Sequence, residues 1–272
     1  MTIWHSFFDE GYNDSTTFCI GSIFAPDYAC AEMGDALSSR IAYENTKLEM
    51  QGYPTISRYH ATDCAALRKE FSAKRGWDQD RQINLTKRIC KILVEEGANG
   101  AVVGGGYKDI RPYLELQANE RKFLYSLSFK VLILMKTTFL RNNFPDDRLK
   151  IFYDVSPEFV SIAKAAERDF RDDPATDGLT EYLIGCEPVT WRDKPEMQLA
   201  DFMTFQGFRR IASSLNGSDR IMKSLDTLIG RMPITIERFQ SQNFADMIRM
   251  HDNDRSGRPI NEGVASSMVT LC

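Results

Sequence analysis

The first 24 residues limit the fold most, because two apolar segments are joined there by a short polar turn and an acidic pair ends the first segment. Residues 2–9 and 16–24 are rich in Ile, Phe, Trp and Thr, and "EGYNDS" between them supplies Gly, Asn and Asp. This composition favours two β-strands and a tight connection. The pattern predicts an antiparallel hairpin whose first strand ends at Asp9 and Glu10.

Apolar periodicity assigns the rest of the chain mainly to alternating helices and strands. Helices are expected over residues 27–43, 78–96, 110–143, 156–170, 196–215, 219–229 and 235–250. Strands are expected over residues 100–107, 148–156 and 186–193, and a short strand is expected to enter a helix in "SRYHATDCAALRKEF". We therefore predict an α/β fold in which a mixed sheet is flanked by helices.

No internal repeat, low-complexity block or linker divides the sequence. We expect a single domain with helical insertions over residues 1–250 and a polar, loose tail over residues 251–272. The net charge of -4 gives no overall attraction to phosphate, so contact with nucleic acid would need a local group of Lys and Arg.

The cysteines and the apolar segments indicate the compartment. Six scattered cysteines without a CxxC pair, and only three histidines, argue against a disulfide framework and a structural zinc site. The longest apolar stretch, residues 123–140, contains Lys130 and Lys136, which would be costly inside a bilayer. The expectation is a cytoplasmic protein in which this stretch is a buried helix, and not a membrane span.

Three aspartates carry the predicted chemistry. Asp9 and Asp154 both end apolar strands, so their carboxylates would lie close together if the strands are neighbours. Asp201 lies on an apolar helix with Met197 and Phe205 one turn away on either side, which places its carboxylate near the core. Like charges in such a group repel unless a cation lies between them. Oxygen ligands suit Mg²⁺ or Mn²⁺, and two such ions roughly 3.5–4 Å apart can promote phosphodiester cleavage.

The order of four motifs extends this interpretation. "FFDEG…FCIGSIF", "RYHATD", "IFYDVS" and "MQLADFMTF" together resemble the domain-of-unknown-function family numbered three thousand eight hundred, whose members look like ribonuclease H-like folds. The resemblance covers residues 1–210. In that family the first strand usually ends Asp-Glu-Ser-Gly, whereas this sequence has Gly11 directly after Glu10.

The resemblance implies a ribonuclease H-like fold and a divalent-metal-dependent nuclease that hydrolyses DNA or RNA with a metal-bound water and two Mg²⁺ or Mn²⁺ ions. A role in bacterial defence or mobile-element biology would fit such an enzyme. It also implies the site residues: Asp9, Asp154 and Asp201 as metal ligands, with Glu10, His60 and Asp63 as further catalytic candidates. The His60 imidazole would move a proton or orient a carboxylate or water.

Each candidate also has a purely structural interpretation. An acidic pair after a strand can simply begin a turn, and Asp154 could cap the helix that follows it. Asp201 could pair with Arg209 in the core. His60 could be a structural histidine, and Thr62 or Asp63 could cap the short helix.

Basic residues near the acidic positions are candidates for binding a phosphate backbone. Lys74, Arg75 and Trp77 lie together in "SAKRGW", where Trp77 could stack on a base, and Arg209 and Arg210 follow the acidic helix. Such groups are more often solvated surface.

Two other functions stay open. One is a non-catalytic module that binds nucleic acid or protein and retains a relict acidic site. The other is a phosphatase or nucleotide hydrolase acting on small phosphates. The Met-rich segments "IMKSL" and "MIRMH" could serve a protein partner or a homo-oligomer, although Met at helical spacing is more often core.

Overall fold

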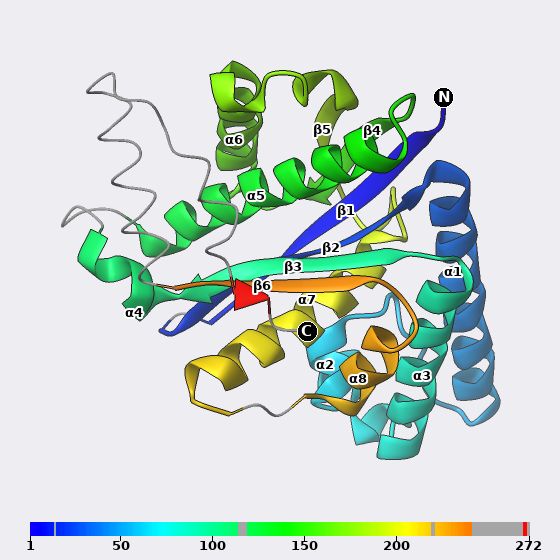
Figure 1. The fold of residues 1–272 in the computed structure, drawn as a ribbon. Helices are drawn as coiled ribbons and strands as arrows, with labels where there is room; N and C mark the ends of the chain where they lie inside the picture. The colour runs from blue at the N-terminus through cyan, green and yellow to red at the C-terminus, as the bar shows by residue number, and fades with distance from the viewer. Residues whose placement is uncertain (14, 114–118, 219–220, 241–268, 271–272) are drawn as a thin grey trace.

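The computed structural model describes residues 1–13, 15–113, 119–218, 221–240 and 269–270, which form one mixed sheet with helices on both faces (Figure 1). The strands are β1 Ile3–Tyr12, β2 Thr17–Pro26, β3 Asn99–Gly106, β4 Arg148–Asp154, β5 Leu183–Val189, β6 Ile234–Phe239 and β7 Val269–Thr270. The α-helices are α1 Asp27–Met50, α2 Ala61–Ala65, α3 Gln79–Glu95, α4 Tyr107–Ile110, α5 Glu120–Asn143, α6 Val160–Asp172, α7 Met197–Leu215 and α8 Lys223–Ile229. Short 3-10 helices cover Lys69–Phe71, Ala73–Arg75, Arg111–Tyr113, Pro174–Thr176 and Thr180–Tyr182.

The sheet combines an antiparallel centre with parallel flanks. Its order is β5-β4-β1-β2-β3-β6-β7. β1, β2 and β3 run antiparallel in sequence, β4 is parallel to β1, β5 is parallel to β4, and β6 is parallel to β3. Six strands form the body of the sheet, and the two residues of β7 pair with β6 at one edge. The predicted mixed α/β sheet with an N-terminal antiparallel hairpin is confirmed.

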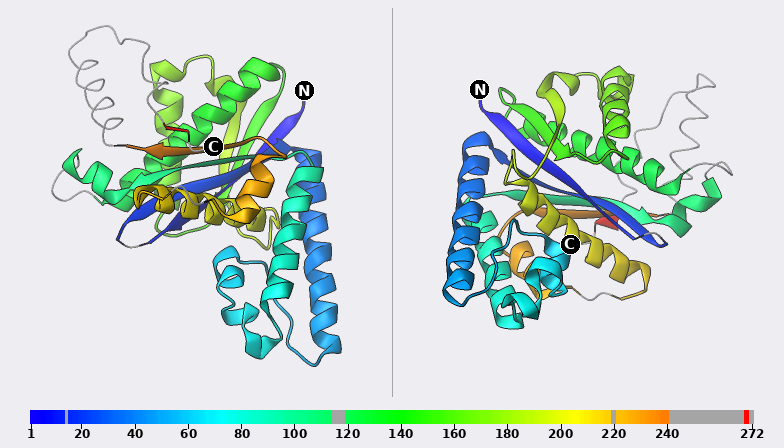
Figure 2. Two further views of the ribbon diagram at one scale, coloured as in Figure 1. Left: turned by 60° about the horizontal axis from the view of Figure 1, so that its bottom comes forward. Right: turned by 180° about the vertical axis from the view of Figure 1, so that it is seen from behind.

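Side-chain alternation along the strands creates two cores. Successive side chains of a strand point to opposite faces, so Phe7 and Phe8 of β1 enter different layers. Phe7 packs in the layer formed with α1, α3, α7 and α8, and Phe8 packs in the layer formed with α5 and α6. Figure 2 shows the two layers from further directions. Full burial of such a ring contributes roughly 1.5–3 kcal/mol, which fixes the register of β1.

Helix α7 lies in very close contact with the centre of the sheet. A Cβ at Gly21 of β2 would come 2.5 Å from the backbone of Thr204, and a Cβ at Gly207 of α7 would come 2.4 Å from the side chain of Val102 on β3. Gly21 therefore permits the backbones of β2 and α7 to approach directly, and Gly207 leaves room for the Val102 side chain under the helix. The Thr204 hydroxyl also donates a hydrogen bond of 3.0 Å to the backbone oxygen of Asp9. The contact sets the height of α7 above β1.

Helix α5 is the one described helix that is long and apolar enough to cross a membrane by length and composition. It covers the face of the sheet opposite α7, and half of its most apolar window is buried within the fold (Figure 1). Ten of its residues, from Leu124 to Leu140, are buried. This arrangement is that of a core helix.

The segments around α2 and β5 differ from the expected elements. The short strand expected directly before α2 is not formed, since no strand lies between α1 and α2. The cap of α2 is His60, whose Nδ1 accepts a hydrogen bond of 3.3 Å from the Asp63 backbone N–H. The expected cap at Thr62 or Asp63 is therefore wrong by two or three residues. β5 begins at Leu183, earlier than expected, because its pairing with β4 includes Leu149 opposite Leu183.

The predicted helix over residues 235–250 is wrong in the part that the structure describes. "ITIERF" forms β6 beside β3, with Ile234 and Ile236 on one face and Phe239 on the other. β-branched residues at alternate positions fit a strand, so the apolar spacing was assigned to the wrong period. Residues 241–250 and most of the predicted tail lie outside the described residues.

Lys136 provides a stability test of the core. This lysine of α5 is only 5% exposed, and its Nζ lies 4.9 Å from the centre of the Phe24 ring. Burial lowers the pKa of Lys136 from 10.5 to about 7. The unfolded chain therefore binds a proton that the folded chain lacks between these values, so the destabilisation is complete below pH 7 and disappears as the pH rises towards 10.5.

We expect Lys136→Met to raise the free energy of unfolding by several kcal/mol near neutral pH and by much less at pH 10.5. Chemical denaturation at both pH values measures the difference. Lys130→Met is the matched control, because Lys130 lies on the same helix and its Nζ is 3.4 Å from Asp169 at the surface. An equal gain for Lys136→Met at both pH values would contradict burial of the charge as the cause.

Candidate active site

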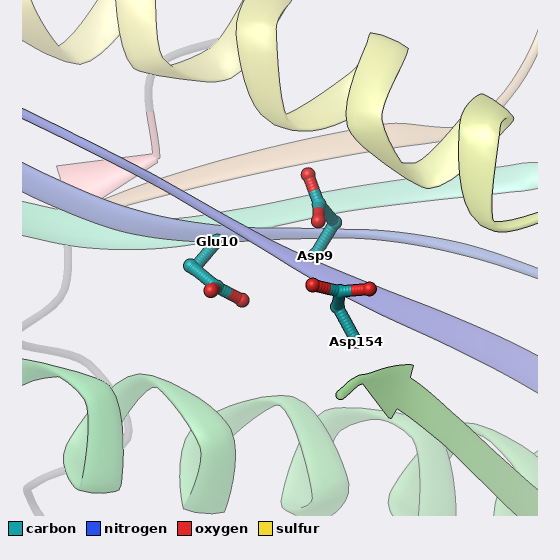
Figure 3. A group of neighbouring side chains, drawn as sticks. All are labelled: Asp9, Glu10 and Asp154. Carbon is teal, nitrogen blue, oxygen red and sulfur yellow. The ribbon is translucent and has the colours of Figure 1, made fainter. Parts of the chain in front are cut away.

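The C-terminal parts of β1 and β4 bring two predicted aspartates together, although β1 continues to Tyr12, past its expected end at Asp9 and Glu10. These parallel strands pair in register from Ile3 with Arg148 to Phe8 with Tyr153, so Asp9 and Asp154 are the next residues along each strand. One carboxylate oxygen from each of Asp9, Glu10 and Asp154 lies within 4.8 Å of the others (Figure 3). The structure therefore contains an acidic cluster that could hold a metal ion.

Strand alternation separates the two neighbouring acids of β1. Figure 3 shows Asp9 pointing towards α7 and Glu10 pointing away from it, with the Asp154 carboxylate approaching from the β4 side. Asp154 is the last residue of β4, and its carboxylate lies close to those of both Asp9 and Glu10. The three carboxylates thus span the end of β1 and do not lie on one face of the sheet.

Asp201 of α7 lies next to this cluster. Its charge is the largest cause, after burial, of the raised pKa of Asp9. Asp201 Oδ2 also accepts a hydrogen bond of 2.8 Å from the backbone N–H of Ala61, and Gln198 Oε1 accepts one of 2.6 Å from the backbone N–H of Tyr59. Two polar side chains of α7 thereby anchor the segment that contains His60.

All four carboxylates open into one cavity of about 670 Å³. Its lining includes Arg58, His60 and Trp191, which come from the loops before α2 and after β5. It also includes residues along α7 and just after it: Asp201, Phe205, Phe208, Arg209, Ser213 and Asn216. The acids therefore face a space that a ligand can enter.

Burial and mutual repulsion disfavour the charged forms of these groups. Burial raises the pKa of Asp9 well above its ordinary value, and the charges of Asp201, Glu10 and Asp154 raise it further. Burial, followed by the Asp154 charge, raises the pKa of Glu10 to about 8. Burial also raises the pKa of Asp154 and of Asp201. The Arg58 charge opposes these shifts at Asp9, Asp154 and Asp201.

The donor set fits a hard divalent cation. In the described part of the chain, no basic side chain lies within ion-pair distance of the carboxylates of Asp9, Glu10, Asp154 or Asp201. The cluster offers only oxygen atoms, which suits Mg²⁺ or Mn²⁺ better than a metal that prefers sulfur or nitrogen. A bound cation would also remove the repulsion between the carboxylates.

His60 lines the cavity, whereas Asp63 does not. The Asp63 side chain is directed to Lys69 Nζ at 2.9 Å, to His60 Nδ1 at 3.2 Å and to Arg68 Nη2 at 3.6 Å. Asp63 therefore supports His60 and is not placed to complete a metal shell. His60 caps α2 and faces the cavity at the same time.

Of the predicted nucleic-acid contacts, Arg209 is the one that lines the cavity. Arg210 is 8% exposed and Trp77 is 1% exposed, so neither is available at the surface, and the expected stacking of Trp77 on a base is wrong. Trp77 packs instead against Phe71. Arg75 donates from Nη2 to the Thr55 backbone oxygen at 2.8 Å, and Lys74 is exposed, away from the cavity lining.

The alternative structural roles of the aspartates do not match the structure. Asp154 does not cap α6, which begins at Val160 and has no side-chain cap. Asp201 accepts from Ala61, and Arg209 is exposed with its guanidinium 5.7 Å from the centre of the Phe205 ring. Neither acid is explained by the capping or pairing that its local sequence allows.

Arg58 is the cavity residue that sequence reasoning missed. It lies two positions before His60, in a segment where a short strand was expected. The single available signal was a basic residue next to the "HATD" motif, which is too common to indicate a site by itself.

No family model matches this sequence, and no curated protein is significantly similar to it. The resemblance given by the order of its motifs is neither supported nor contradicted by these comparisons.

The clustered charges predict a response to divalent cations. Wild-type protein is expected to melt at a higher temperature with Mn²⁺ than with EDTA, since the ion binds the folded acidic cluster. Asp9→Asn is expected to raise the melting temperature in EDTA, because it removes a buried like charge, and to reduce the Mn²⁺-induced increase. Differential scanning calorimetry measures both effects. Asp146→Asn, at an exposed turn, is the matched control. An undiminished Mn²⁺ effect in Asp9→Asn would place the ion elsewhere.

The raised pKa of Glu10 predicts that stability without metal falls with increasing pH. The folded chain keeps the Glu10 proton up to about pH 8, whereas the unfolded chain releases it near 4.5. The stabilisation is therefore complete below pH 4.5 and is lost as the pH rises towards 8. We expect Glu10→Gln to flatten this decline in urea unfolding with EDTA. A slope identical to that of wild type would show that Glu10 does not contribute.

Proposed function

We propose that this protein is a divalent-metal-dependent phosphodiesterase that hydrolyses DNA or RNA on a ribonuclease H-like fold. The observation that carries the proposal is the convergence of Asp9, Glu10, Asp154 and Asp201, from β1, β4 and α7, in one open cavity without a neutralising ion pair in the described part of the chain. All four acids are half-buried, and unpaired carboxylates that are partly removed from water destabilise a fold, so their presence together favours a functional role.

The sheet supports the proposed fold family. The antiparallel β1–β2–β3 segment, with β4 and β5 added parallel to β1, agrees with a mixed sheet of the expected kind. The acids lie at the end of the central strand β1, on its parallel neighbour β4 and on α7, which matches the order of the motifs in the sequence.

The four acids would hold one or two Mg²⁺ or Mn²⁺ ions. When bound, such ions supply Lewis-acid polarisation of the phosphate and ease deprotonation of the attacking water. Asp9 and Asp201 are the best-fixed ligands, because Thr204 holds the Asp9 backbone and the Ala61 N–H holds the Asp201 carboxylate. Fixed ligands hold their geometry without a further loss of side-chain entropy on binding.

His60 is placed to move a proton at the edge of the cavity. Its Nδ1 accepts from the Asp63 backbone N–H, which leaves the proton of a neutral ring on Nε2. From Nε2 the imidazole can donate to a leaving oxygen and later recover a proton from water. The Asp63 carboxylate also lies 3.2 Å from Nδ1, so both the backbone and the side chain of Asp63 contact the ring.

The shape of the cavity supports a polymeric substrate. Phe205 and Phe208 of α7 are half-buried and line the cavity, and Arg209 lines it beside them. Half-buried rings next to a basic side chain are typical of surfaces where bases stack and phosphates bind. A site for inorganic phosphate or a small phosphate ester has no need of this extension.

The test is cleavage of labelled single- and double-stranded DNA and RNA with Mg²⁺ or Mn²⁺. Asp9→Asn and Asp201→Asn are each expected to lower kcat/KM at least about 100-fold, the order of effect seen when a group that stabilises transition-state charge is removed. Asp146→Asn is the control and should cleave like wild type. Undiminished cleavage in both cavity variants would contradict the assigned ligands. Phosphate release from nucleotides, with all polymers intact, would indicate a small-molecule phosphatase instead.

A further inference from the structure

Arg58 is a cation inside an otherwise acidic cavity. It lines the same space as Asp9, Asp154 and Asp201, and its charge lowers the pKa of all three carboxyls. Its guanidinium therefore lies within electrostatic reach of three of the four acids. The proposed role of the carboxylates as metal ligands does not by itself explain why an arginine lies among them.

The Arg58 guanidinium is held by an aromatic ring and not by a carboxylate. It lies 5.5 Å from the centre of the Trp191 ring. In the part of the chain that the structure describes, Arg58 has no ion pair within 4.0 Å, although four carboxylates share its cavity. A guanidinium stacked on an indole keeps its N–H groups in the ring plane available for an anion.

Two hydrogen bonds directly after Arg58 in the chain position this segment relative to the acids. The next residue, Tyr59, donates its backbone N–H to Gln198 Oε1 at 2.6 Å, and Ala61 donates to Asp201 Oδ2 at 2.8 Å. Both acceptors are on α7, which also carries one of the four acids. The segment with Arg58 and the acidic helix therefore form one rigid unit, which is the arrangement that a preorganised site requires.

We propose that Arg58 binds the phosphate group that is cleaved, with its guanidinium donating hydrogen bonds to non-bridging phosphate oxygens beside the acidic cluster. This inference rests on the proposed function. A phosphodiester is an anion, and a cavity with four carboxylates repels it unless cations offset the charge. The planar guanidinium fork matches two phosphate oxygens at once, and it stabilises the charge that develops on them during cleavage.

A different role would be to neutralise the carboxylates and so stabilise the fold. The two roles predict opposite effects on metal binding. If Arg58 binds substrate, its removal leaves the acidic cluster intact and more negative, so Mn²⁺ binds equally well or more tightly. If Arg58 holds the cluster together, its removal disorganises the ligands and weakens Mn²⁺ binding.

The experiment compares Arg58→Ala and Arg58→Lys with Arg192→Ala. Arg192 is the matched control, since its guanidinium also lies over Trp191, at 4.7 Å, but it is exposed and does not line the cavity. Three quantities are measured: kcat/KM for oligonucleotide cleavage with Mn²⁺, binding of a fluorescent oligonucleotide with Ca²⁺, and Mn²⁺ affinity by calorimetry.

For Arg58→Ala we expect kcat/KM to fall about 100-fold or more and oligonucleotide binding to weaken about tenfold, with Mn²⁺ affinity equal to or above wild type. Arg58→Lys should recover part of both losses, because it restores the charge but not the fork. Arg192→Ala should resemble wild type in all three measurements.

Wild-type cleavage and binding by Arg58→Ala would overturn the inference and leave the proposed function standing. A loss of Mn²⁺ affinity that parallels the loss of cleavage would also overturn it, in favour of a structural role. If wild-type protein cleaves nothing, the proposed function fails, but oligonucleotide binding that depends on Arg58 still supports a phosphate site. The absence of both cleavage and binding in wild type overturns both proposals.

Discussion

The direct contact between α7 and the sheet is the constraint on which the site depends. Gly21 lies against the backbone of Thr204, so no side chain separates the helix from β2 there, and Gly207 makes room for the Val102 side chain of β3. The Thr204 hydroxyl then reaches the backbone oxygen of Asp9. Because side chains one turn apart share a helix face, this contact also holds Asp201 beside Asp9. A larger residue at Gly21 would lift α7 and separate its acid from those of β1 and β4.

The two apolar cores offset the repulsion within the acidic cluster. Phe7 and Phe8 immediately precede Asp9 and are buried on opposite faces of the sheet, as are Phe152 and Tyr153 immediately before Asp154. These buried side chains hold both strands in place up to the residues directly before the acids. Fraying of the strand ends therefore does not separate the carboxylates. Stability supplied by the core thus maintains a charge arrangement that is unfavourable by itself, as expected where function overrides local preference.

The sequence was most informative where one periodic pattern had one structural solution. The hairpin, the strand that ends at Asp154 and helix α7 have unambiguous apolar spacing, so the meeting of three distant aspartates could be anticipated. The strand β6 could not, because "ITIERF" fits either period until its pairing with β3 is known. Trp77 and Arg58 also depend on tertiary packing, which buries the first and directs the second into the cavity. The opposite orientations of Asp9 and Glu10 follow from strand alternation. The sequence does not show that Asp154, at the end of β4, has a carboxylate close to both of them.

The order of the acids along the chain has a consequence for biosynthesis. The hairpin with Asp9 and Glu10 leaves the ribosome first, Asp154 follows much later, and Asp201 comes after nearly three quarters of the 272-residue sequence. A nascent polypeptide therefore lacks a complete site until α7 has emerged and docked. Under the proposed function, cleavage therefore requires nearly the whole described fold and cannot begin on the N-terminal half alone.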